Sequence, residues 1–370
     1  MKEVLKIILF LIVFIGFISC KKESPVETDS NLPKFQPQTG EFDLIGLENK
    51  KVTNFAINEI EPWRIIASTD ENMLYVTNDY GKTWSNIEMF NYPAAYLMWD
   101  KVNSNMVYFS NRNALARIFN EKFNRWIIYF FKSSDYGYSW MPADSGIPQS
   151  STQYIKVFTV DPYVGGVIYG GTEECAPFFS GSLIKSKENC SYWYELSEKL
   201  SRPGEIPLDI SINYLTPPTI LYSDASRGIY RTTDIGNSWK FFSYPDNNFI
   251  QHCLSKYSLF GFGIISQSVN EFLGITNDAF ATFTKINNDD FNRSSFSDIL
   301  INLEDQLFVT ATYKGSDSSY VYISKDKGST WSKLGSDINK KTLLGYDPKN
   351  NFLYVVMDGV KKGLYRYQLK

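Results

Sequence analysis

Beyond residue 41 the chain is a long series of short apolar segments, each bounded by Gly, Pro, Asn, Asp or Ser. Examples are residues 74–76 (LYV), 168–169 (IY), 229–231 (IYR) and 352–358 (FLYVVMD). Short apolar stretches with turn residues at both ends are typical of β-strands. The pattern therefore predicts an all-β protein built from many strands.

A second pattern, Ser/Thr-x-Asp-x-Gly-x-Ser/Thr-Trp, recurs between these strands. Four segments match it and two are weaker copies, and their first residues are 44 to 56 positions apart. Six copies at such regular spacing do not arise by chance, and the spacing suits a four-stranded propeller blade. The four matches are residues 77–84 (TNDYGKTW), 133–140 (SSDYGYSW), 232–239 (TTDIGNSW) and 324–331 (SKDKGSTW); the weaker copies are residues 186–193 (SKENCSYW) and 276–283 (TNDAFATF).

The conserved positions of this repeat have local structural tasks. We expect each Asp to accept backbone N–H bonds from the turn that follows it, and each Gly to supply a positive φ. We expect each terminal aromatic ring to pack beside the next blade. Glu188 to Cys190 and Asp278 to Phe280 depart from the pattern, which favours another turn geometry there. The residues interpreted as structural are Asp79, Gly81, Trp84, Asp135, Gly137, Trp140, Trp193, Asp234, Gly236, Trp239, Asp278, Phe283, Asp326, Gly328 and Trp331.

The repeated segments resemble Asp boxes, also called BNR repeats, which occur in sialidases, sortilin-type receptors, xyloglucanases and a photosystem II assembly factor. The turn at Asp161 and Pro162, followed by a strand with Tyr169, is one of several that resemble the sortilin, xyloglucanase and assembly-factor branch more than sialidases. The resemblance covers residues 42–370 and implies a β-propeller. It also implies that ligands bind at the face of the strand 2–3 loops or in the central channel.

The two ends of this region predict how the ring closes. Residues 42–47 (FDLIGL) form a lone strand before the first blade, and residues 342–370 supply only three strands after the last repeat. A blade without its fourth strand would expose an unpaired edge. We therefore predict that residues 42–47 pair with residues 363–369 and complete a seventh blade; an open six-bladed arrangement is the alternative.

The first twenty residues have the pattern of a targeting segment. Lys2 and Lys6 precede twelve apolar residues, 7–18, which is short of the about 20 needed to span a bilayer. Residues 17–20 (FISC) resemble the lipobox of bacterial lipoproteins, although Phe17 stands where Leu is usual. The resemblance implies cleavage before Cys20 and acylation of its new N-terminus. An ordinary secretory signal and an uncleaved signal anchor are the alternatives.

Residues 21–41 are polar, contain three prolines and show no apolar period, so they are typical of a disordered tether. Lys21 follows the cysteine, at the position where the familiar signal for retention in the inner membrane has Asp. We therefore predict a lipid-anchored protein of the bacterial outer membrane, periplasmic or exposed at the cell surface. The expected organisation is a signal peptide at residues 1–19, the lipidated Cys20 with its tether at residues 20–41, and a propeller at residues 42–370.

Composition narrows the chemistry. The formal net charge of −3 argues against a protein that binds duplex nucleic acid. His252 is the only histidine, and it is interpreted as a hydrogen-bonded structural residue. Cys175 and Cys190 are expected on opposite faces and Cys253 in an inner strand, so no disulfide is predicted. No phosphate loop, zinc spacing or EF-hand occurs, and we predict neither a metal nor a cofactor.

Two long loops carry the candidate binding residues. They connect strands 2 and 3 of the second and third blades, at residues 111–126 (NRNALARIFNEKFNRW) and 172–181 (TEECAPFFSG). Exposed aromatic rings beside charged groups suit a carbohydrate or a peptide, whereas the alternative is that these rings only cover their own loops. The candidate ligand-binding residues are Arg112, Arg117, Trp126, Glu173, Glu174, Phe178 and Phe179.

The sequence favours a non-catalytic binding protein whose partner is an envelope protein or a carbohydrate. A sialidase-like glycoside hydrolase is the alternative, but no Arg-Ile-Pro signature precedes the first repeat and no catalytic residue is assigned. A paired set of carboxylates in a deep central pocket would favour the enzyme. A role as an assembly or secretion helper would rest on the resemblance alone.

Overall fold

A computed structural model of the chain describes residues 40–88, 94–111, 117–120, 125–128, 130–147, 153–174, 180–201, 204–316, 318–338 and 342–369. The chain divides into two compact units, Met1–Gln36 and Pro37–Lys370, and every described residue belongs to the second. The predicted signal peptide, Cys20 and most of the predicted tether lie outside the described residues. Among the described residues, no helix is long and apolar enough to cross a membrane.

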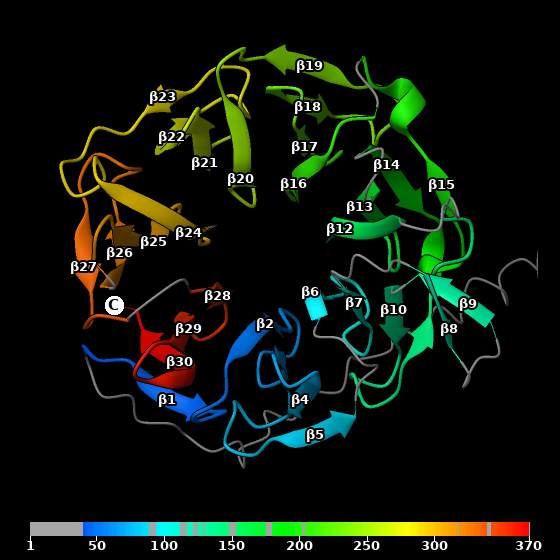
Figure 1. Ribbon diagram of the computed structural model, residues 1–370, viewed down its shortest axis with the longest axis horizontal. Coiled ribbons are helices and arrows are strands. Elements are labelled where there is room, and N and C mark those ends of the chain that lie inside the picture. Colours follow the sequence, from blue (N-terminus) through cyan, green and yellow to red (C-terminus); the bar gives the residue numbers. More distant parts are fainter. Residues whose placement is uncertain are drawn as a thin grey trace, which may run out of the picture. The chain divides into compact units, whose positions relative to one another are not determined.

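Seven four-stranded antiparallel sheets stand around a central axis as the blades of a propeller (Figure 1). This confirms the predicted seven-bladed all-β fold. Blade 1 consists of β2 (Val52–Ile57), β3 (Ile65–Thr69), β4 (Met73–Thr77) and β5 (Ser85–Glu88); blade 2 of β6 (Ala94–Trp99), β7 (Val107–Asn111), β10 (Phe130–Ser133) and β11 (Met141–Pro142); blade 3 of β12 (Gln153–Val160), β13 (Ile168–Glu174), β14 (Gly181–Ser186) and β15 (Trp193–Glu195); and blade 4 of β16 (Pro207–Ile212), β17 (Ile220–Asp224), β18 (Gly228–Thr232) and β19 (Lys240–Ser243).

The ring closes as predicted. The strand after the tether, β1 (Asp43–Gly46), pairs with β30 and completes blade 7, with Asp43 opposite Arg366 and Leu44 opposite Tyr365. The sheet edge that the last three strands would expose is therefore paired within the chain. Blade 5 consists of β20 (Asn248–Leu254), β21 (Gly261–Gln267), β22 (Asn270–Thr276) and β23 (Thr284–Lys285); blade 6 of β24 (Ser294–Ile301), β25 (Leu307–Tyr313), β26 (Ser319–Ser324) and β27 (Ser332–Leu334); and blade 7 of β28 (Leu344–Asp347), β29 (Phe352–Asp358), β30 (Lys362–Gln368) and β1.

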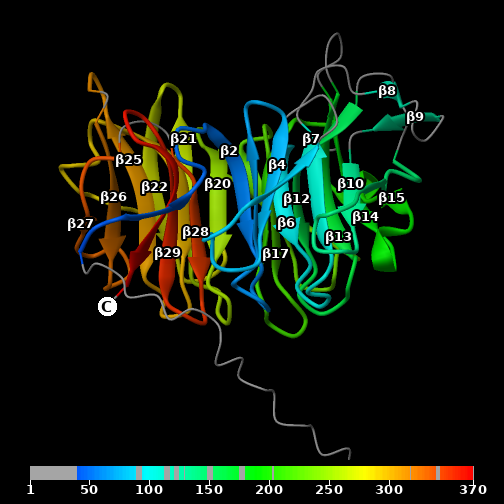
Figure 2. The same ribbon diagram turned by 90° about the horizontal axis from the view of Figure 1, so that it is seen from below.

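The ring has two faces, which Figure 2 shows edge-on. The box face carries the turns between strands 1 and 2 and between strands 3 and 4, where the repeats lie. The link face carries the strand 2–3 loops and the connections between blades. The hairpin of β8 (Arg117–Asn120) and β9 (Arg125–Ile128), inserted between β7 and β10, extends from the link face. The short 3-10 helices η1 (Glu188–Cys190) and η2 (Ser197–Lys199) both belong to blade 3.

The hydrophobic core is divided among the contacts between blades. Each cluster of buried apolar side chains in the described residues joins two neighbouring blades, and together the clusters cover all seven contacts of the ring. The second strand of a blade is buried on both faces, as in β3, β17 and the first five residues of β25. The ring is therefore held together by apolar layers between sheets.

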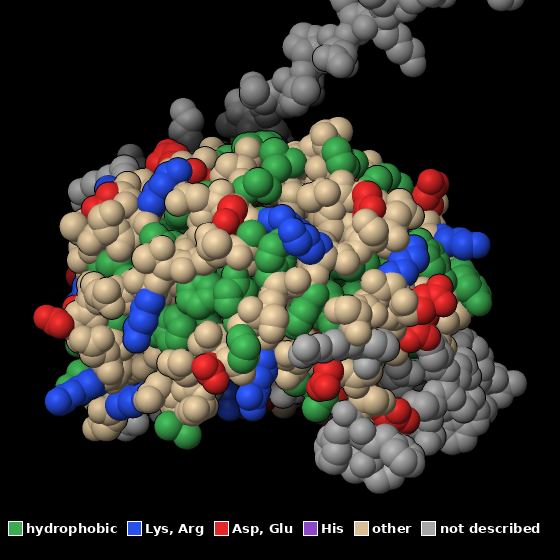
Figure 3. Space-filling model, turned by 90° about the horizontal axis from the view of Figure 1, so that it is seen from above, with side chains coloured by type: hydrophobic (Ala, Val, Ile, Leu, Met, Phe, Trp, Pro, Cys, Tyr) green, Lys and Arg blue, Asp and Glu red, His purple; other side chains and the backbone are tan. Residues whose placement is uncertain are grey.

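The side of the ring shown in Figure 3 carries no large region of one charge among its coloured residues. Figure 3 shows the side on which β19 and β23 lie, with acidic and basic side chains interspersed among apolar patches. This distribution agrees with the formal net charge of −3.

The repeats form tight turns with the same hydrogen bonds in most blades. In blade 1, Asp79 Oδ1 accepts bonds from the Thr83 amide at 2.9 Å and from the Thr77 hydroxyl at 2.7 Å. Gly81, at φ 87°, donates its amide to the Thr77 hydroxyl. The carboxylates of Asp135, Asp234 and Asp326 accept equivalent bonds. In blade 6, the hydroxyl and amide of Thr330 hold the pKa of Asp326 at about 2.

The two weaker repeats behave differently from each other. In blade 5, Asp278 Oδ1 accepts the Thr282 amide at 2.9 Å, and Phe280 takes the glycine position at φ 57°. The expectation of another geometry is therefore wrong for blade 5, because these bonds need only backbone and hydroxyl groups. It is confirmed for blade 3, where the Ser186 hydroxyl donates inward to the Gly166 carbonyl and Glu188 is exposed.

The terminal aromatic rings pack against the preceding blade, so the predicted position beside the next blade is wrong. The Trp84 indole of blade 1 donates to the carbonyl of Ile45 in blade 7 at 3.3 Å, and the Trp193 indole of blade 3 donates to Ala143 of blade 2 at 2.7 Å. Trp140, Trp239 and Trp331 join clusters shared with the preceding blades in the same way. The reason is that each turn itself lies over the preceding blade, as Gly81 does over Ile45.

Candidate functional site

The central channel is lined by the first strand of each blade, and most of these strands share one irregularity. In blades 1 to 6 the pairing of strand 1 with strand 2 skips a residue, the mark of a β-bulge. The residue after the bulge is Asn54 in blade 1, Asp209 in blade 4, Gln251 in blade 5 and Asp298 in blade 6.

All four of these polar side chains connect neighbouring blades: Gln251 Nε2 donates to Asp298 Oδ1 of blade 6 at 2.5 Å, and the other three accept a backbone amide of the next blade. Asn54 Oδ1 accepts the Leu97 amide of blade 2 at 3.2 Å, and Asp209 Oδ2 accepts the His252 amide of blade 5 at 2.6 Å. Asp298 Oδ2 accepts the Leu344 amide of blade 7 at 2.7 Å. We call these contacts the inner bonds, because each joins the inner strands of two successive blades. They use backbone N–H groups that would otherwise lack a partner beside the channel.

The same side chains line a pocket of about 630 Å³, the central pocket. Its residues lie mostly in the first halves of β2, β20 and β24, which start at the link face. Polar groups and apolar side chains alternate around it, which suits a ligand of mixed character. The lining residues are Thr53, Asn54, Phe55, Tyr96, Asp209, Ile250, Gln251, Ile264, Phe296, Ser297, Asp298, Leu343 and Leu344.

The two carboxyl groups of the central pocket face no cation within its lining. Burial raises the pKa of Asp209 to about 7 and that of Asp298 to about 6. Backbone amides that donate to both groups, and the Gln251 side chain that donates to Asp298, oppose this shift but do not cancel it. Near neutral pH both groups therefore exchange between the neutral and the charged form.

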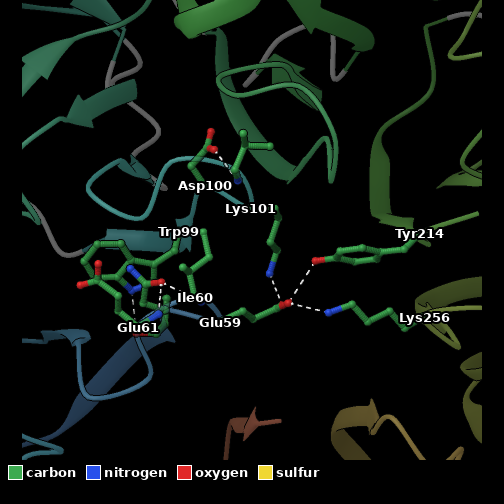
Figure 4. A network of polar contacts seen from close by, with 11 residues as sticks. Glu59, Ile60, Glu61, Trp99, Asp100, Lys101, Tyr214 and Lys256 are labelled. Atoms are coloured by element: carbon green, nitrogen blue, oxygen red, sulfur yellow. Dashed lines mark hydrogen bonds and ion pairs between the residues drawn. The ribbon is translucent and has the colours of Figure 1, made fainter. Parts of the chain in front are cut away.

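The opposite end of the channel contains paired charges. Glu59 follows β2 in blade 1 and receives hydrogen bonds from Lys101 of blade 2, from Tyr214 of blade 4 at 3.0 Å and from Lys256 of blade 5 at 3.1 Å (Figure 4). We call these four residues the Glu59 network. Blades 4 and 5 lie opposite blade 1 in a ring of seven, so the Glu59 network crosses the channel at the box face.

The charge of Glu59 is well compensated. Burial alone would raise its pKa, but Lys101 and Lys256 outweigh burial and lower the pKa to about 2. The channel is thus crossed by side chains at its box end and forms a pocket at its link end.

His252 is a structural histidine, in agreement with the sequence interpretation. Its ring is buried, with Nδ1 2.7 Å from the Ser211 hydroxyl and Nε2 3.2 Å from the Ser223 hydroxyl. Burial lowers the pKa of His252 to about 3. Although Asp209, His252 and Ser223 resemble a catalytic triad by residue type, Ser223 is itself buried and donates to the Phe249 carbonyl. The group lacks an exposed nucleophile.

The predicted loop platform is only partly described. Arg112, Phe178 and Phe179 lie outside the described residues, while Arg117 and Trp126 lie on the facing strands of the β8–β9 hairpin. Glu173 binds Lys156 at 2.8 Å and the Tyr154 hydroxyl at 3.0 Å, and Glu174 accepts the Ser180 hydroxyl at 2.8 Å. Both carboxylates are therefore engaged by side chains of their own blade.

Other chemistry expected from the sequence is sparse among the described residues. Cys190 and Cys253 are free thiols, Cys253 is only partly buried, and Cys20 and Cys175 lie outside the described ranges. Within those ranges, no group of three or more His, Cys, Asp or Glu is placed to hold a metal ion.

The fold and its pocket define the class: a seven-bladed β-propeller with a pocket at one end of its channel. Neither a protein-family model nor a curated protein matches the sequence. Solved structures of similar fold include YCF48 bound to D1 peptide (12% identity, TM-score 0.60, 92% of this chain and 100% of that one) and YCF48 from Cyanidioschyzon merolae (11%, 0.59, 89% and 98%). An ancestral GH74 enzyme is also similar (10%, 0.65), and the chain spans about half of that enzyme, 48%. At these identities the likeness shows the fold alone.

Proposed function

We propose that the protein is a non-catalytic binding propeller of the bacterial cell envelope, which holds a protein or a glycan at its link face. The observation that carries this proposal is the central pocket, a cavity of about 630 Å³ with mixed polar and apolar walls at the link end of the channel. The β8–β9 hairpin extends from the same face and enlarges the surface that a partner would meet. A similar propeller, YCF48, has been solved with a bound peptide, which supports a partner of this kind.

The proposed setting is the outer membrane, with the propeller tethered through an acylated Cys20. The lipobox-like residues 17–20 and the polar residues 21–41 support this proposal. Cells grown with labelled palmitate should label the wild-type protein and not a Cys20→Ala variant. Equal labelling of both proteins would contradict the anchor.

Binding is tested by probing the purified protein with a glycan array and with envelope extract, followed by affinity measurement on each hit. Ile250 lines the pocket and is 41% exposed, so Ile250→Trp fills the cavity without disturbing the core. We expect that variant to lose at least about tenfold in affinity, whereas Leu303→Trp, at an equally exposed site on the box face, stays unchanged. Equal affinity of the two variants would contradict binding at the central pocket.

A glycoside hydrolase is the second candidate, favoured by the two carboxyl groups in one pocket. Such enzymes need two carboxyl groups in different protonation states on either side of the scissile bond. Here burial raises the pKa of both Asp209 and Asp298, and both accept amides of neighbouring blades. In blade 1 the amide side chain of Asn54 makes the same inner bond as Asp209 and Asp298. The bond to the next blade is therefore sufficient to explain a polar residue at this position. Turnover of fluorogenic glycosides that Asp298→Asn abolishes would favour the enzyme.

A further inference from the structure

The charge of the central pocket differs from that of a second cavity in the ring. The second cavity, of about 570 Å³, lies beside the irregular turn of blade 3. Its lining contains two acids and two lysines, Asp161, Glu188, Lys185 and Lys187. The described lining of the central pocket contains two acids, Asp209 and Asp298, and neither lysine nor arginine. This uncompensated charge favours a ligand of the opposite sign.

The lack of a cation extends to the whole strands that line the central pocket. None of β2, β6, β16, β20, β21, β24 and β28 contains Lys or Arg (Figure 1). The skipped residue of the bulge lines the pocket in blades 1, 5 and 6, as Thr53, Ile250 and Ser297. In blade 3 that residue is Lys156, which lies outside the lining and binds Glu173 at 2.8 Å.

Both carboxyl groups keep acceptor capacity toward a ligand. An ionised carboxylate offers about four acceptor sites. Asp209 accepts the backbone amides of His252 and Ile210, which use two of these sites. Asp298 accepts the backbone amides of Leu344 and Ile299 and the side chain of Gln251, which use three. Asp209 therefore has the larger remaining capacity.

Apolar side chains of several blades form the rest of the wall. They are Phe55, Ile250, Ile264, Phe296, Leu343 and Leu344. Ile250 is 41% exposed, so this apolar wall reaches solvent. Lysine and arginine side chains have stems of three or four methylene groups, which pack along apolar surface while the charged head reaches polar groups. The combination of apolar walls and carboxylates suits such a side chain.

We propose that the central pocket binds a lysine or arginine side chain of a partner protein, with the cationic head at Asp209 and Asp298 and the stem against the apolar walls. This inference rests on the proposed function, because it names the ligand of the same pocket. A bound cation also compensates carboxylates that are costly to ionise in a buried site.

A sugar is served less well by the central pocket, because its hydroxyl groups need free polar partners. The Thr53 hydroxyl lies 2.9 Å from the Ser68 hydroxyl, and the Ser297 hydroxyl lies 2.7 Å from that of Thr310. The hydroxyl groups of Thr53 and Ser297 are therefore already engaged within the chain. This favours a protein segment over an amino sugar as the source of the cation.

Binding of a cation should be coupled to pH, because the pKa of Asp209 is about 7 and that of Asp298 about 6. Apart from tyrosines, the other ionisable groups of the lining strands are His252, Cys253 and Asp347. Burial lowers the pKa of His252 to about 3 and raises that of Cys253 well above its ordinary value. Asp347 lies at the box end of β28. Ionisation of Asp209 and Asp298 therefore dominates the pocket between pH 5 and pH 8.

The proposal is tested with a short, fluorescently labelled peptide, acetylated and amidated, that has a single Lys between Leu residues. Matched peptides have Arg or Gln in its place. We expect the full-length protein to bind the Lys and Arg peptides at least about tenfold more tightly than the Gln peptide at pH 8. Affinity for the Lys peptide should fall at least about tenfold at pH 5, where the carboxylates are mostly protonated, while affinity for the Gln peptide stays unchanged.

The chain offers a matched control for the carboxylate. Asp209→Asn removes the charge and keeps an acceptor for the His252 amide, as Asn54 does for Leu97. It should weaken the Lys peptide at least about tenfold at pH 8. Glu71→Gln removes an exposed acid from a strand 2–3 loop of the same face, outside the pocket, and should change affinity less than twofold.

Proton release separates binding at the carboxylates from an indirect effect of Asp209→Asn on the fold. Calorimetry at pH 6.5, in buffers of different ionisation enthalpy, should show release of about one proton for each Lys peptide bound to the wild type. With saturating peptide, Asp209→Asn should lower this to about a quarter of a proton, because only Asp298 still titrates. Equal proton release by both proteins would contradict a cation at Asp209.

Three further results would overturn the proposal. They are equal affinities for the Lys and Gln peptides, equal losses in Asp209→Asn and Glu71→Gln, and tighter binding of an amino-sugar oligomer such as chitosan than of the Lys peptide. If Ile250→Trp weakens a partner found in the array or extract while the Lys peptide fails to bind, the binding function stands and only the cationic ligand is overturned. If Ile250→Trp leaves every such partner unaffected, the proposed function itself is contradicted.

Discussion

The two ends of the central channel carry acidic residues in opposite circumstances. At the box end, Glu59 is bound by Lys101, Tyr214 and Lys256, and its pKa is lowered to about 2. At the link end, Asp209 and Asp298 accept only amide donors, and burial raises the pKa of each. Acidic side chains are therefore paired with cations at the box end of the channel and lie without a cation in the described lining of the link end.

This difference separates charges that hold the ring together from charges that cost stability. A carboxylate paired with two ammonium groups stabilises the fold wherever it is ionised. A buried carboxyl group without a cation favours its neutral form, so ionisation at higher pH weakens the fold. Asn54 makes an inner bond without this cost, so the inner bonds alone do not require acids. The acids at the link end are therefore the groups to test for a role in binding.

The largest effect is expected at the box end. Glu59→Gln leaves Lys101 and Lys256 without a counter-charge and should lower the free energy of unfolding by about 2–3 kcal/mol at pH 7. Urea denaturation measures the loss. Glu71→Gln removes an exposed salt bridge to Lys50 and should change stability by less than about 0.5 kcal/mol. A Glu59 variant no less stable than the Glu71 variant would show that the Glu59 network does not stabilise the ring.

A smaller, pH-dependent effect is expected at the link end. The pKa of Asp209 is about 7 in the folded protein, above its ordinary value of 3.8. The folded state thus keeps the proton longer, and this contribution to stability, complete below the ordinary pKa, is lost as pH rises through about 7. From pH 5 to pH 8, the free energy of unfolding of Asp209→Asn should rise relative to that of the wild type by about 2 kcal/mol.

For Asp298→Asn, with a pKa of about 6 in the wild type, the same shift should be about 1 kcal/mol. Urea denaturation at the two pH values gives both differences. Comparing Asp298→Asn with the wild type at each pH cancels the opposite contribution of His252, whose lowered pKa costs stability as pH falls. A difference independent of pH would mean that the buried acids are ionised throughout.

The smallest effect isolates the inner bond from the charge. Asn54→Ala removes the acceptor of the Leu97 amide and should cost about 1 kcal/mol, equally at pH 5 and pH 8. Thermal and urea unfolding at both pH values check this. If the loss changed with pH, the pH dependence of the aspartate variants would not be attributable to their carboxyl groups.

Much of the fold could be predicted because its determinants are local and repeated. The apolar strands and the Asp-Gly turns each lie within a few residues, and the lone strand at residues 42–47 follows from counting strands. The direction of Trp84 and Trp193 was predicted wrongly, since it depends on which blade each turn covers. The regular turn at Asp278 was missed because a side chain at the positive-φ glycine position raises the free energy of the turn but does not forbid it. The packing of Phe280 between blades 4 and 5 offsets this unfavourable free energy.

The central pocket could not be predicted in the same way. Asn54, Asp209, Gln251 and Asp298 are single polar residues in separate strands, and their equivalence appears only when the bulges are aligned. A polar residue at the same place in successive inner strands was the available signal. Glu59 and Lys256 are nearly two hundred residues apart, and no local pattern relates them.

The sequence by itself determined the repeat, the strand count and the closing strand, because short-range alternation and turn chemistry fix local structure. Only the tertiary structure decided which end of the channel is crossed by paired charges and which holds a pocket. It also decided that the irregular turn of blade 3 borders a second cavity. The physical reason is that burial and charge compensation depend on groups brought together from different blades, and closing the ring is what brings them together.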